Sequence, residues 1–443
     1  MSLELANYIV KVGLEKGAQD VIAIVTRSDE HMFRFANNSL TIVKNWSRES
    51  ANMLIGINKK TIVVSLTKLD KDTIGRVVDK VVKTSKYLEP DKDYTQLPGE
   101  KFEYKSIPDT YDPKIEALEN ASEYVDAAIN AALKEGAEKV AGVLVYNVGE
   151  KFLSTSTGIE ASEKGTSIKL SVRAFCGEEA SGHGVEVSRV LSRFNPERPG
   201  REAGEYARRA VNPIEGEPGT YETILSPLVV ANLFGDVAFI GASAFMVEAG
   251  FSFFADKLGE KVASDVLTVY DDGRYPNGYG STMFDDEGTP TTRTVIIEKG
   301  VLKSLLHNNK TARKFQTTST GNAGWVVPHP WNVVIEPGSY TLEDMISQVD
   351  NGIFVTNNWY TRFQNYREGI FSTICRDAVF RIRNGELAEP LKGLRISGRM
   401  LDLLQNISVL SKERVQIQWW EAEIPVFAPY MLIKNVNFTK ATL

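Results

Sequence analysis

The chain has 443 residues, of which 42% are hydrophobic and 24% are charged, and its formal net charge is -6. These values are ordinary for a soluble globular protein, and the length suggests two or three domains. The negative charge argues against a broad nucleic-acid surface, because such surfaces draw most of their affinity from Lys and Arg. No apolar stretch approaches the roughly 18 residues of a membrane span, and the N-terminus has no secretory signal pattern. With only Cys176 and Cys375 no disulfide framework is expected, so the sequence predicts a cytoplasmic protein.

The N-terminal region combines two helical patterns with a strand-rich run between them. Apolar residues recur at helical spacing from Leu5 to Leu14, and Gly17 is a suitable helix end. A second apolar stripe runs from Ile74 to Val82. The strands predicted between these helices are 21–25, 32–35, 40–44, 53–57 and 61–66, the last two flanking a turn at Asn58-Lys59-Lys60.

Residues 87–113 hold four prolines among many charges, which indicates a linker or an extended crossing segment. The pattern then restarts with a helical stripe over 115–133 that ends at Gly136, another β-rich run, and a helix around 201–210. The segments 14–21 and 133–140 are alike in pattern. This likeness suggests a degenerate internal repeat, although helix ends of the Lys/Glu-Gly-Ala type also recur by coincidence.

The composition changes after Asn212-Pro213, and residues 215–220 indicate a boundary. Beyond it we expect one long apolar helix over 228–246, hairpins at Glu298-Lys299-Gly300 and Asn384-Gly385, and shorter helices near 341–349 and 400–405. The predicted class is therefore α+β. Two repeated helix–antiparallel-sheet–helix units, 1–110 with the linker and 111–214, precede a mostly β C-terminal domain, 215–443, with one long buried helix.

Three short motifs in the C-terminal region carry a family resemblance. They are Gly259-Glu260-Lys261-Val262-Ala263-Ser264, Asp285-Asp286-Glu287-Gly288-Thr289-Pro290 and Thr320-Gly321-Asn322. In this order and spacing they resemble the C-terminal domain of the TldD/PmbA (TldD/TldE) family, whose members often carry the label "modulator of DNA gyrase". The active members are metalloproteases with a His-Glu-x-x-x-His motif shortly before these segments. This chain has no such motif, so it resembles the PmbA/TldE type of subunit.

Aligned on Gly259-Glu260, the family's protease motif falls on residues 235–240. Gly235 and Ile240 stand where the two histidines would be, and neither side chain can coordinate zinc. Asp236 stands near the position of the catalytic Glu, but a base without a metal-bound water has nothing evident to activate. The family's Cys ligand near the C-terminus is also missing, because residues 415–420 contain no Cys. The resemblance thus implies no catalytic or metal-ligating residue and no cofactor in this chain, with zinc only in a TldD-type partner.

The resemblance implies a substrate-cleft role for seven other residues. These are Asp285, Asp286, Glu287, Gly288, Thr320, Gly321 and Asn322. Clustered carboxylates also suit hard cations, but an Asp-rich segment with Gly is typical of a turn. The loop 317–324 lacks the spacing of a phosphate-binding loop, and its backbone amides could hold an extended peptide.

Other candidate sites are weaker. Gly241-Ala242-Ser243-Ala244-Phe245 breaks the serine-hydrolase elbow at its last position. His183 lies in a glycine-rich stretch and is expected to be a solvated loop residue, with a Cys176–His183 nucleophile pair as the alternative. The aromatic pairs Trp359-Tyr360 and Trp419-Trp420, together with Trp325 and Trp331, are either core residues or part of a partner interface or peptide groove.

The function predicted from these features is a non-catalytic subunit of a TldD/TldE-type zinc metalloprotease, inactive alone. It would pair with a TldD-type subunit and help to form the chamber that admits unfolded or short peptides. Two alternatives stay open: a homodimeric peptide-binding protein without proteolytic activity, and a DNA gyrase modulator. No nucleic-acid or membrane partner is expected from the residues themselves.

Overall fold

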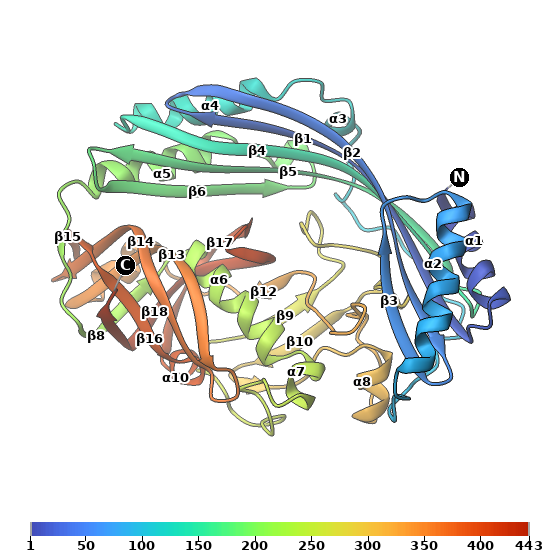
Figure 1. Cartoon of the computed structure of the whole chain (residues 1–443). Helices are drawn as coiled ribbons and strands as arrows, with labels where there is room; N and C mark the ends of the chain where they lie inside the picture. Colours follow the sequence, from blue (N-terminus) through green and yellow to red (C-terminus); the bar gives the residue numbers. More distant parts are fainter. Residues whose placement is uncertain (1, 442–443) are drawn as a thin grey trace.

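The computed structural model describes residues 2–441. Its N-terminal half contains a six-stranded antiparallel sheet in the order β3-β2-β1-β4-β5-β6 (Figure 1). The strands are β1 (Asp20–Ala36), β2 (Ser39–Ile57), β3 (Lys60–Leu66), β4 (Lys139–Thr155), β5 (Glu160–Cys176) and β6 (Ala180–Ser188). Strands from both predicted N-terminal units therefore belong to one sheet.

Helices cover this sheet at two separate places. The helices of this half are α1 (Ser2–Glu15), α2 (Lys71–Thr84), η1 (Ser85–Tyr87), α3 (Pro113–Glu116), α4 (Ser122–Lys134), η2 (Leu191–Arg193) and α5 (Glu197–Arg209). Helices α1 and α2 share a core with Val21 and Val25 at the start of β1, whereas α3, α4 and α5 share another with Phe33 and Phe35 near its end. The long strand β1 therefore contributes to both cores. The helix ends at Gly17 and Gly136 are confirmed, and both glycines have positive φ.

Two sequence predictions in this half were wrong in extent. The strands expected at 21–25 and 32–35 are the single strand β1, and those expected at 40–44 and 53–57 are β2. The polar residues between them do not end a strand, because each is paired with a neighbouring strand and none is Gly or Pro. The helix expected over 115–133 is divided into α3 and α4, and the Ser122 amide at the start of α4 donates to Asn120 Oδ1 at 2.9 Å.

The C-terminal half is mostly β, as predicted. Its twelve-stranded sheet has the order β11-β10-β9-β12-β18-β8-β13-β14-β15-β7, with β16 on β14 and β18, and β17 on β18. The strands are β7 (Ile214–Glu215), β8 (Gly219–Leu225), β9 (Val269–Asp272), β10 (Arg293–Glu298), β11 (Val301–Leu302), β12 (Val333–Ile335), β13 (Asn351–Asn365), β14 (Ile370–Arg383), β15 (Glu386–Lys392), β16 (Leu394–Arg399), β17 (Ile407–Trp419) and β18 (Ala422–Lys440). The short helices are α8 (Asn309–Lys314), α9 (Leu342–Ser347) and α10 (Met400–Gln405).

The buried helix expected over 228–246 is present but broken. The structure has α6 (Pro227–Asp236), a π-helical turn η3 (Val237–Gly241) and a short helix α7 (Ala244–Glu248). The chain leaves the helix after Gly241, where a Cβ would lie 2.9 Å from ring atoms of Phe253 and Phe254. The Ser243 hydroxyl then donates to the Pro328 carbonyl at 2.8 Å. Hydrophobic periodicity could not foresee this break, because apolar residues lie on nearly all sides of the segment.

The six-stranded sheet arches over the C-terminal half, and the segment from Leu88 to Asp112 crosses between them without regular structure (Figure 1). Asn309 Nδ2 donates to the Gln96 carbonyl at 2.6 Å, and the Asn277 amide donates to the Pro108 carbonyl at 3.3 Å. This segment is therefore an extended crossing segment that fastens the two halves together. The domain boundaries at 110/111 and 214/215 stay predictions. In the described part of the chain, no helix is long and apolar enough to cross a membrane.

Candidate functional site

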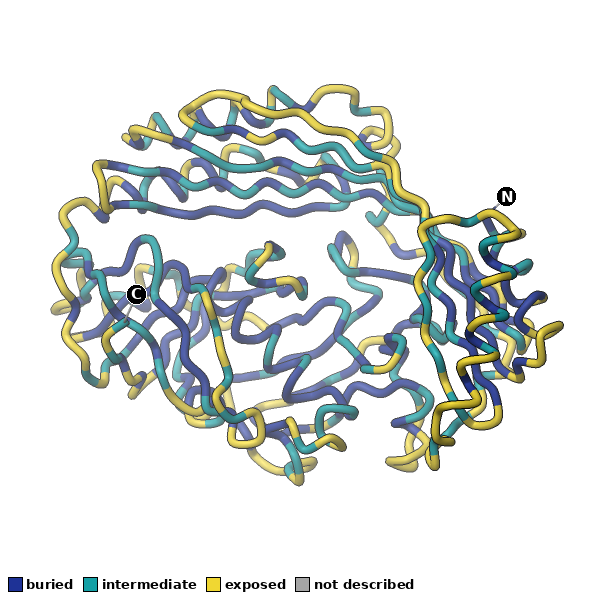
Figure 2. The backbone as a smooth tube through the Cα atoms, in the orientation of Figure 1, coloured by how far each residue is buried: buried dark blue, intermediate teal, exposed yellow. Residues whose placement is uncertain are grey.

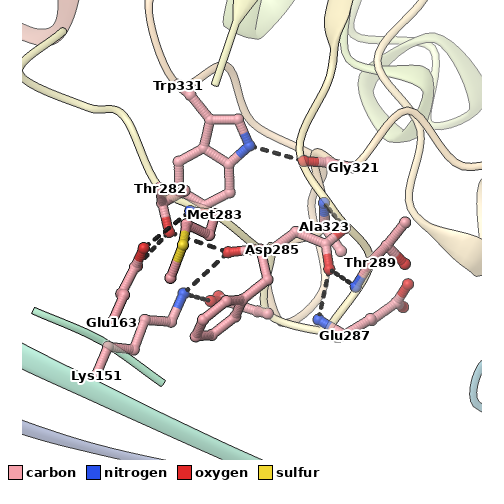
Figure 3. A network of polar contacts seen from close by, with 12 residues as sticks. Lys151, Glu163, Thr282, Met283, Asp285, Glu287, Thr289, Gly321, Ala323 and Trp331 are labelled. Carbon is pink, nitrogen blue, oxygen red and sulfur yellow. Dashed lines mark hydrogen bonds and ion pairs between the residues drawn. The ribbon is translucent and has the colours of Figure 1, made fainter. Parts of the chain in front are cut away.

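Two of the family motifs, far apart in sequence, meet below the six-stranded sheet. Residues 282–290 lie in the connection between β9 and β10, and residues 320–323 lie between α8 and β12. The Asp286 amide donates to the Ala323 carbonyl at 3.0 Å, and the Ala323 amide donates to Asp285 Oδ2 at 3.0 Å. We call residues 282–290 together with 320–323 the cleft wall (Figure 3).

Asp285 organises the turn inside the cleft wall. Its Oδ1 accepts hydrogen bonds from the amides of Glu287 at 2.9 Å and Thr289 at 2.8 Å, while Oδ2 accepts the Ala323 bond. Gly288 has φ +83, a conformation that L side chains rarely adopt. The segment is thus a tight turn closed by one carboxylate, with no open set of oxygens facing an ion.

Glu287 and Asp285 are neighbouring carboxyl groups whose pKa values are raised. Glu287 is partly buried, and its Oε2 accepts from the Asn309 amide at 2.9 Å. Burial and the neighbouring Asp285 raise the pKa of Glu287 to about 8, and burial raises the pKa of Asp285 to about 7. Of this pair Glu287 retains its proton to the higher pH, because Asp285 accepts three backbone hydrogen bonds that favour its ionised form.

The six-stranded sheet holds the cleft wall through two charged side chains. Lys151 of β4 lies 3.2 Å from Asp286 Oδ1, with its ammonium 4.9 Å from the centre of the Phe284 ring. Glu163 of β5 accepts from the Thr282 hydroxyl and from the Met283 amide, the latter at 2.8 Å (Figure 3). Nothing in the sequence pointed to Lys151 or Glu163, because each is one of several charged residues on a long strand.

The Thr320-Gly321-Asn322 segment is also held by its own polar groups. Thr320 Oγ1 accepts from the His307 amide at 2.8 Å, the Gly321 carbonyl accepts from Trp331 Nε1 at 2.8 Å, and Asn322 Nδ2 donates to Asp271 Oδ2 at 2.6 Å. Asn322 is fully buried. These side chains therefore shape the cleft wall from behind and have little freedom to contact a ligand directly.

A cavity of about 560 Å³ lies beside the cleft wall. It is bounded by β1, β4 and β5, by the crossing segment at 106–111, and by the C-terminal loop at 279–283. The partly buried Arg189 guanidinium joins these three parts, since it donates to the carbonyls of Thr110 at 2.8 Å and Ser281 at 3.1 Å and also to that of Thr166. The cavity is thus built from both halves of the molecule.

The positions of the missing protease motif lie elsewhere, on α6 and η3. Gly235 faces Ile424, to which a Cβ at this position would come within 3.6 Å. Ile240 is buried in the apolar core. Burial, with the Glu421 carboxylate nearby, raises the pKa of Asp236 to about 7. A zinc site does not fit these residues, because two of the three positions have no donor atom in the side chain.

The backbone at these positions departs from a regular α-helix. In a regular α-helix two residues five positions apart point about 140° away from each other. The η3 turn instead contains an i to i+5 hydrogen bond, from the Ala242 amide to the Val237 carbonyl at 3.2 Å. Such a turn brings residues five apart closer to the same side. The turn therefore brings positions 235 and 240 nearer to one side of the helix, but neither Gly235 nor Ile240 has a side-chain atom that can bind a metal.

The histidines do not form an alternative centre. His183 was expected in a solvated loop, but it is fully buried on β6, with Nε2 2.9 Å from Ser171 Oγ and Nδ1 3.1 Å from Asn357 Nδ2. The glycines around it are strand residues that let α5 approach closely. Cys176 lies at the hairpin end of β5 with its thiol on the Gly136 carbonyl, away from such a pair. Among residues 2–441, no three His, Cys, Asp or Glu side chains are grouped to hold a metal ion.

The aromatic pairs are divided between core and surface. Trp419 is buried, whereas Trp420 is 63% exposed and Tyr360 is 52% exposed. Arg362 lies 4.1 Å from the Tyr360 ring centre and Arg376 lies 4.6 Å from that of Trp359. The Glu421 carboxylate accepts from the Tyr360 amide at 3.4 Å. Of the two interpretations, core packing therefore holds for Trp419. Tyr360 and Trp420 are exposed and stay candidates for a partner interface or peptide groove.

Comparisons with known proteins agree with this architecture. A family profile described as the PmbA/TldA metallopeptidase C-terminal domain matches residues 218–440, and one for the central domain matches residues 105–211. A metalloprotease of Methanothermobacter thermautotrophicus is 31% identical over 49% of this chain, and the match spans about half (48%) of that relative. The metalloprotease PmbA of Escherichia coli O157:H7 is 27% identical over 79% of this chain and 78% of its own length.

Two solved structures share the whole fold. TldE from Thermococcus kodakarensis has a TM-score of 0.85 at 23% identity, covering 98% of this chain and 100% of its own. A Thermotoga maritima protein described as a candidate modulator of a DNA gyrase has a TM-score of 0.85 at 24% identity, covering 99% and 100%. The profile over the C-terminal half, with its motifs at 285–290 and 320–322, decides the assignment: this chain belongs to the PmbA/TldD metallopeptidase family.

Proposed function

We propose that this chain is the non-catalytic, PmbA/TldE-like subunit of a cytoplasmic TldD/TldE-type zinc metalloprotease that degrades or processes unfolded peptides. One observation carries the proposal. The positions of the protease motif lie on a buried helix, but Gly235 and Ile240 have no side-chain atoms to bind a metal.

In this proposal a TldD-type partner supplies the zinc, the base and the attacking water, and this chain supplies part of the substrate chamber. The arching sheet, the cleft wall and the 560 Å³ cavity support that role. A cavity of this size takes a short extended segment of peptide rather than a folded domain. Its mixed lining of charged side chains and backbone groups suits a peptide of varied sequence.

The test compares this chain alone, a TldD-type partner alone and the two co-expressed. Zinc content is measured by elemental analysis. Hydrolysis is measured with an unfolded fluorogenic peptide. We expect one zinc per complex, none in this chain alone, and hydrolysis that needs the partner. The matched control is a complex in which the partner's motif glutamate is replaced by Gln, which should abolish hydrolysis. Stoichiometric metal in this chain alone, with equal hydrolysis by this chain and the complex, would overturn the proposal.

The same samples separate the two other functions. Peptide binding without hydrolysis in every mixture would favour a homodimeric peptide-binding protein. Salt-dependent binding of duplex DNA would favour a gyrase modulator, although the net charge of -6 gives that function no electrostatic support.

A further inference from the structure

The two halves of the molecule meet along β6, the last strand of the arching sheet. Although β6 lies at the edge of that sheet, it is buried over nearly its whole length, because α5 and strands β13, β14 and β17 lie against it (Figure 2). Two arginines lie at this junction. Arg173 belongs to β5 and Arg376 belongs to β14, so each half supplies one guanidinium.

One carboxylate beside these arginines is already used by other groups. Asp377 Oδ1 accepts from the Ser181 hydroxyl at 2.6 Å and from Arg173 Nη2, and Oδ2 accepts from Asn357 Nδ2 at 2.7 Å. The Asp377 side chain is fully buried, and its φ of +57 is strained for a residue other than Gly. Asp377 is thus fixed in place as the ion-pair partner of Arg173.

Arg376 has no such partner. None of its N–H groups has an acceptor among residues 2–441, and its guanidinium lies 4.6 Å from the centre of the Trp359 ring. Burial, together with the nearby Arg173, lowers the pKa of Arg376, because both disfavour its charged form. The stacked ring limits the freedom of the guanidinium. Arg376 therefore presents unused donors in a restricted position.

A cavity of about 330 Å³ adjoins the junction. It lies where the strands covering one side of β14 are interrupted, since β16 pairs with β14 up to Ile374 and β15 pairs with it from Phe380. The charged residues of the lining are Glu179, Arg376, Asp377 and Lys392. Lys392 is paired with Glu179 at 2.6 Å and Asp377 with Arg173, so Arg376 is the charge of this lining that has no ion-pair partner.

We propose that this site binds the C-terminal carboxylate of a peptide, with Arg376 as the principal donor. A single uncompensated positive charge matches a monoanion, and the planar fork of an arginine matches the two oxygens of a carboxylate. The cavity is at the lower end of the range for ligand sites, about 300–1,000 Å³, so it admits the end of a chain rather than its middle. The inference rests on the proposed peptide substrate and names the end that this chain recognises.

Calorimetric titration of the full chain, without a partner, tests the ligand. The probes are acetyl-trialanine as the free acid and the same peptide as its amide. We expect the dissociation constant of the acid to be at least about tenfold lower, because a charge-assisted bidentate contact is lost in the amide. Equal affinities would overturn the proposal.

Two further probes separate other sources of an oxyanion. An amidated peptide with a central Asp carries its carboxylate on a side chain, and inorganic phosphate carries no peptide. We expect both to bind at least about tenfold more weakly than the acid peptide. Binding of either one as tight as that of the acid peptide would overturn the assignment to a peptide C-terminus.

Substitutions at Arg376 test the residue. Arg376→Gln should remove the difference between acid and amide, whereas Arg376→Lys retains the charge without the fork and should preserve part of it. The Lys variant also guards against loss of the fold, which circular dichroism checks in both. Arg362→Gln is the matched control, because Arg362 lies over the Tyr360 ring and outside the cavity lining, and it should bind as the unaltered chain does. An undiminished preference for the acid in folded Arg376→Gln would overturn the proposal.

The outcome is distinguishable from that of the proposed function. If the lone chain prefers the acid peptide but no mixture with a TldD-type partner hydrolyses it, the carboxylate site stands and the protease role fails. If the mixture hydrolyses peptides while the lone chain binds acid and amide equally, the protease role stands and the carboxylate site fails.

Discussion

The cleft wall at 282–290 and the helical turn at 235–241 come from neighbouring parts of one family domain, yet different interactions hold them in place. In the cleft wall, Asp285 accepts three backbone hydrogen bonds and Asp286 pairs with Lys151 of the six-stranded sheet. The turn lies in the apolar core, and its Gly235 and Ile240 have no side-chain atom that could bind a metal. Polar side chains thus hold the first region, whereas apolar packing holds the second.

Asp285→Ala should give the largest effect on the cleft-wall side of this comparison. It removes the acceptor of three backbone N–H groups in a buried turn, and each unsatisfied donor costs about 1–3 kcal/mol. We expect a loss of about 3–5 kcal/mol in the free energy of unfolding, measured by urea denaturation. Asp286→Asn, which affects only the Lys151 ion pair, is the matched control and should cost about 1 kcal/mol. Equal losses would mean that the turn does not depend on Asp285.

The pH dependence of stability should come next, and Glu287 should contribute to it. Its pKa is raised from 4.5 to about 8, so folding favours its protonated form. That contribution is complete below about pH 4.5 and is lost as the pH rises through about 8, so stability should fall across this range. Glu287→Gln mimics the protonated acid and should flatten the fall in urea midpoints between pH 5 and pH 8. Glu343→Gln on an exposed helical position is the control, and a flat profile in the unaltered chain would refute this assignment.

Glu163→Ala tests the connection between the cleft wall and the sheet. The substitution leaves the Met283 amide without its charged acceptor, so we expect a loss of about 2–3 kcal/mol. Glu163→Gln retains one carbonyl acceptor and should lose about 1 kcal/mol. Limited proteolysis at 279–290 should increase in the Ala variant before global unfolding. If both variants behave alike, the charge of Glu163 does not anchor this loop.

Substitutions of Gly235 and Gly241 by Ala should have the smallest effects on stability. One should stabilise the protein and the other should destabilise it. A Cβ at Gly235 meets only Ile424 at 3.6 Å, so Gly235→Ala should stabilise the protein by about 0.5–1 kcal/mol through helix propensity. At Gly241 a Cβ would lie 2.9 Å from Phe253 and Phe254, so Gly241→Ala should destabilise it by about 1–3 kcal/mol. Thermal denaturation of the pair is the measurement. Destabilisation by Gly235→Ala would indicate that this position still has a specific packing role.

Sequence patterns predicted the fold class, the helix ends at Gly17 and Gly136, and α10 to the residue, because these depend on local periodicity and backbone conformation. They failed where polar residues continue a strand, as at 26–31 of β1, and where an apolar helix breaks at Gly241. Both outcomes depend on neighbours distant in sequence. For the same reason His183 was misplaced, since its burial is provided by Ser171 and Asn357.

The sequence by itself determined the family, the order of motifs and the absence of metal ligands at Gly235 and Ile240, since residue identity alone decides whether a side chain has a donor atom. Tertiary structure alone decided that Asp285 and Ala323 meet, that Lys151 and Glu163 hold the cleft wall, and that β2 has a free edge. These features depend on which long strands become neighbours. Paired strands are often distant in sequence, and their pairing depends on how whole helices and sheets pack. No short sequence pattern therefore encodes it.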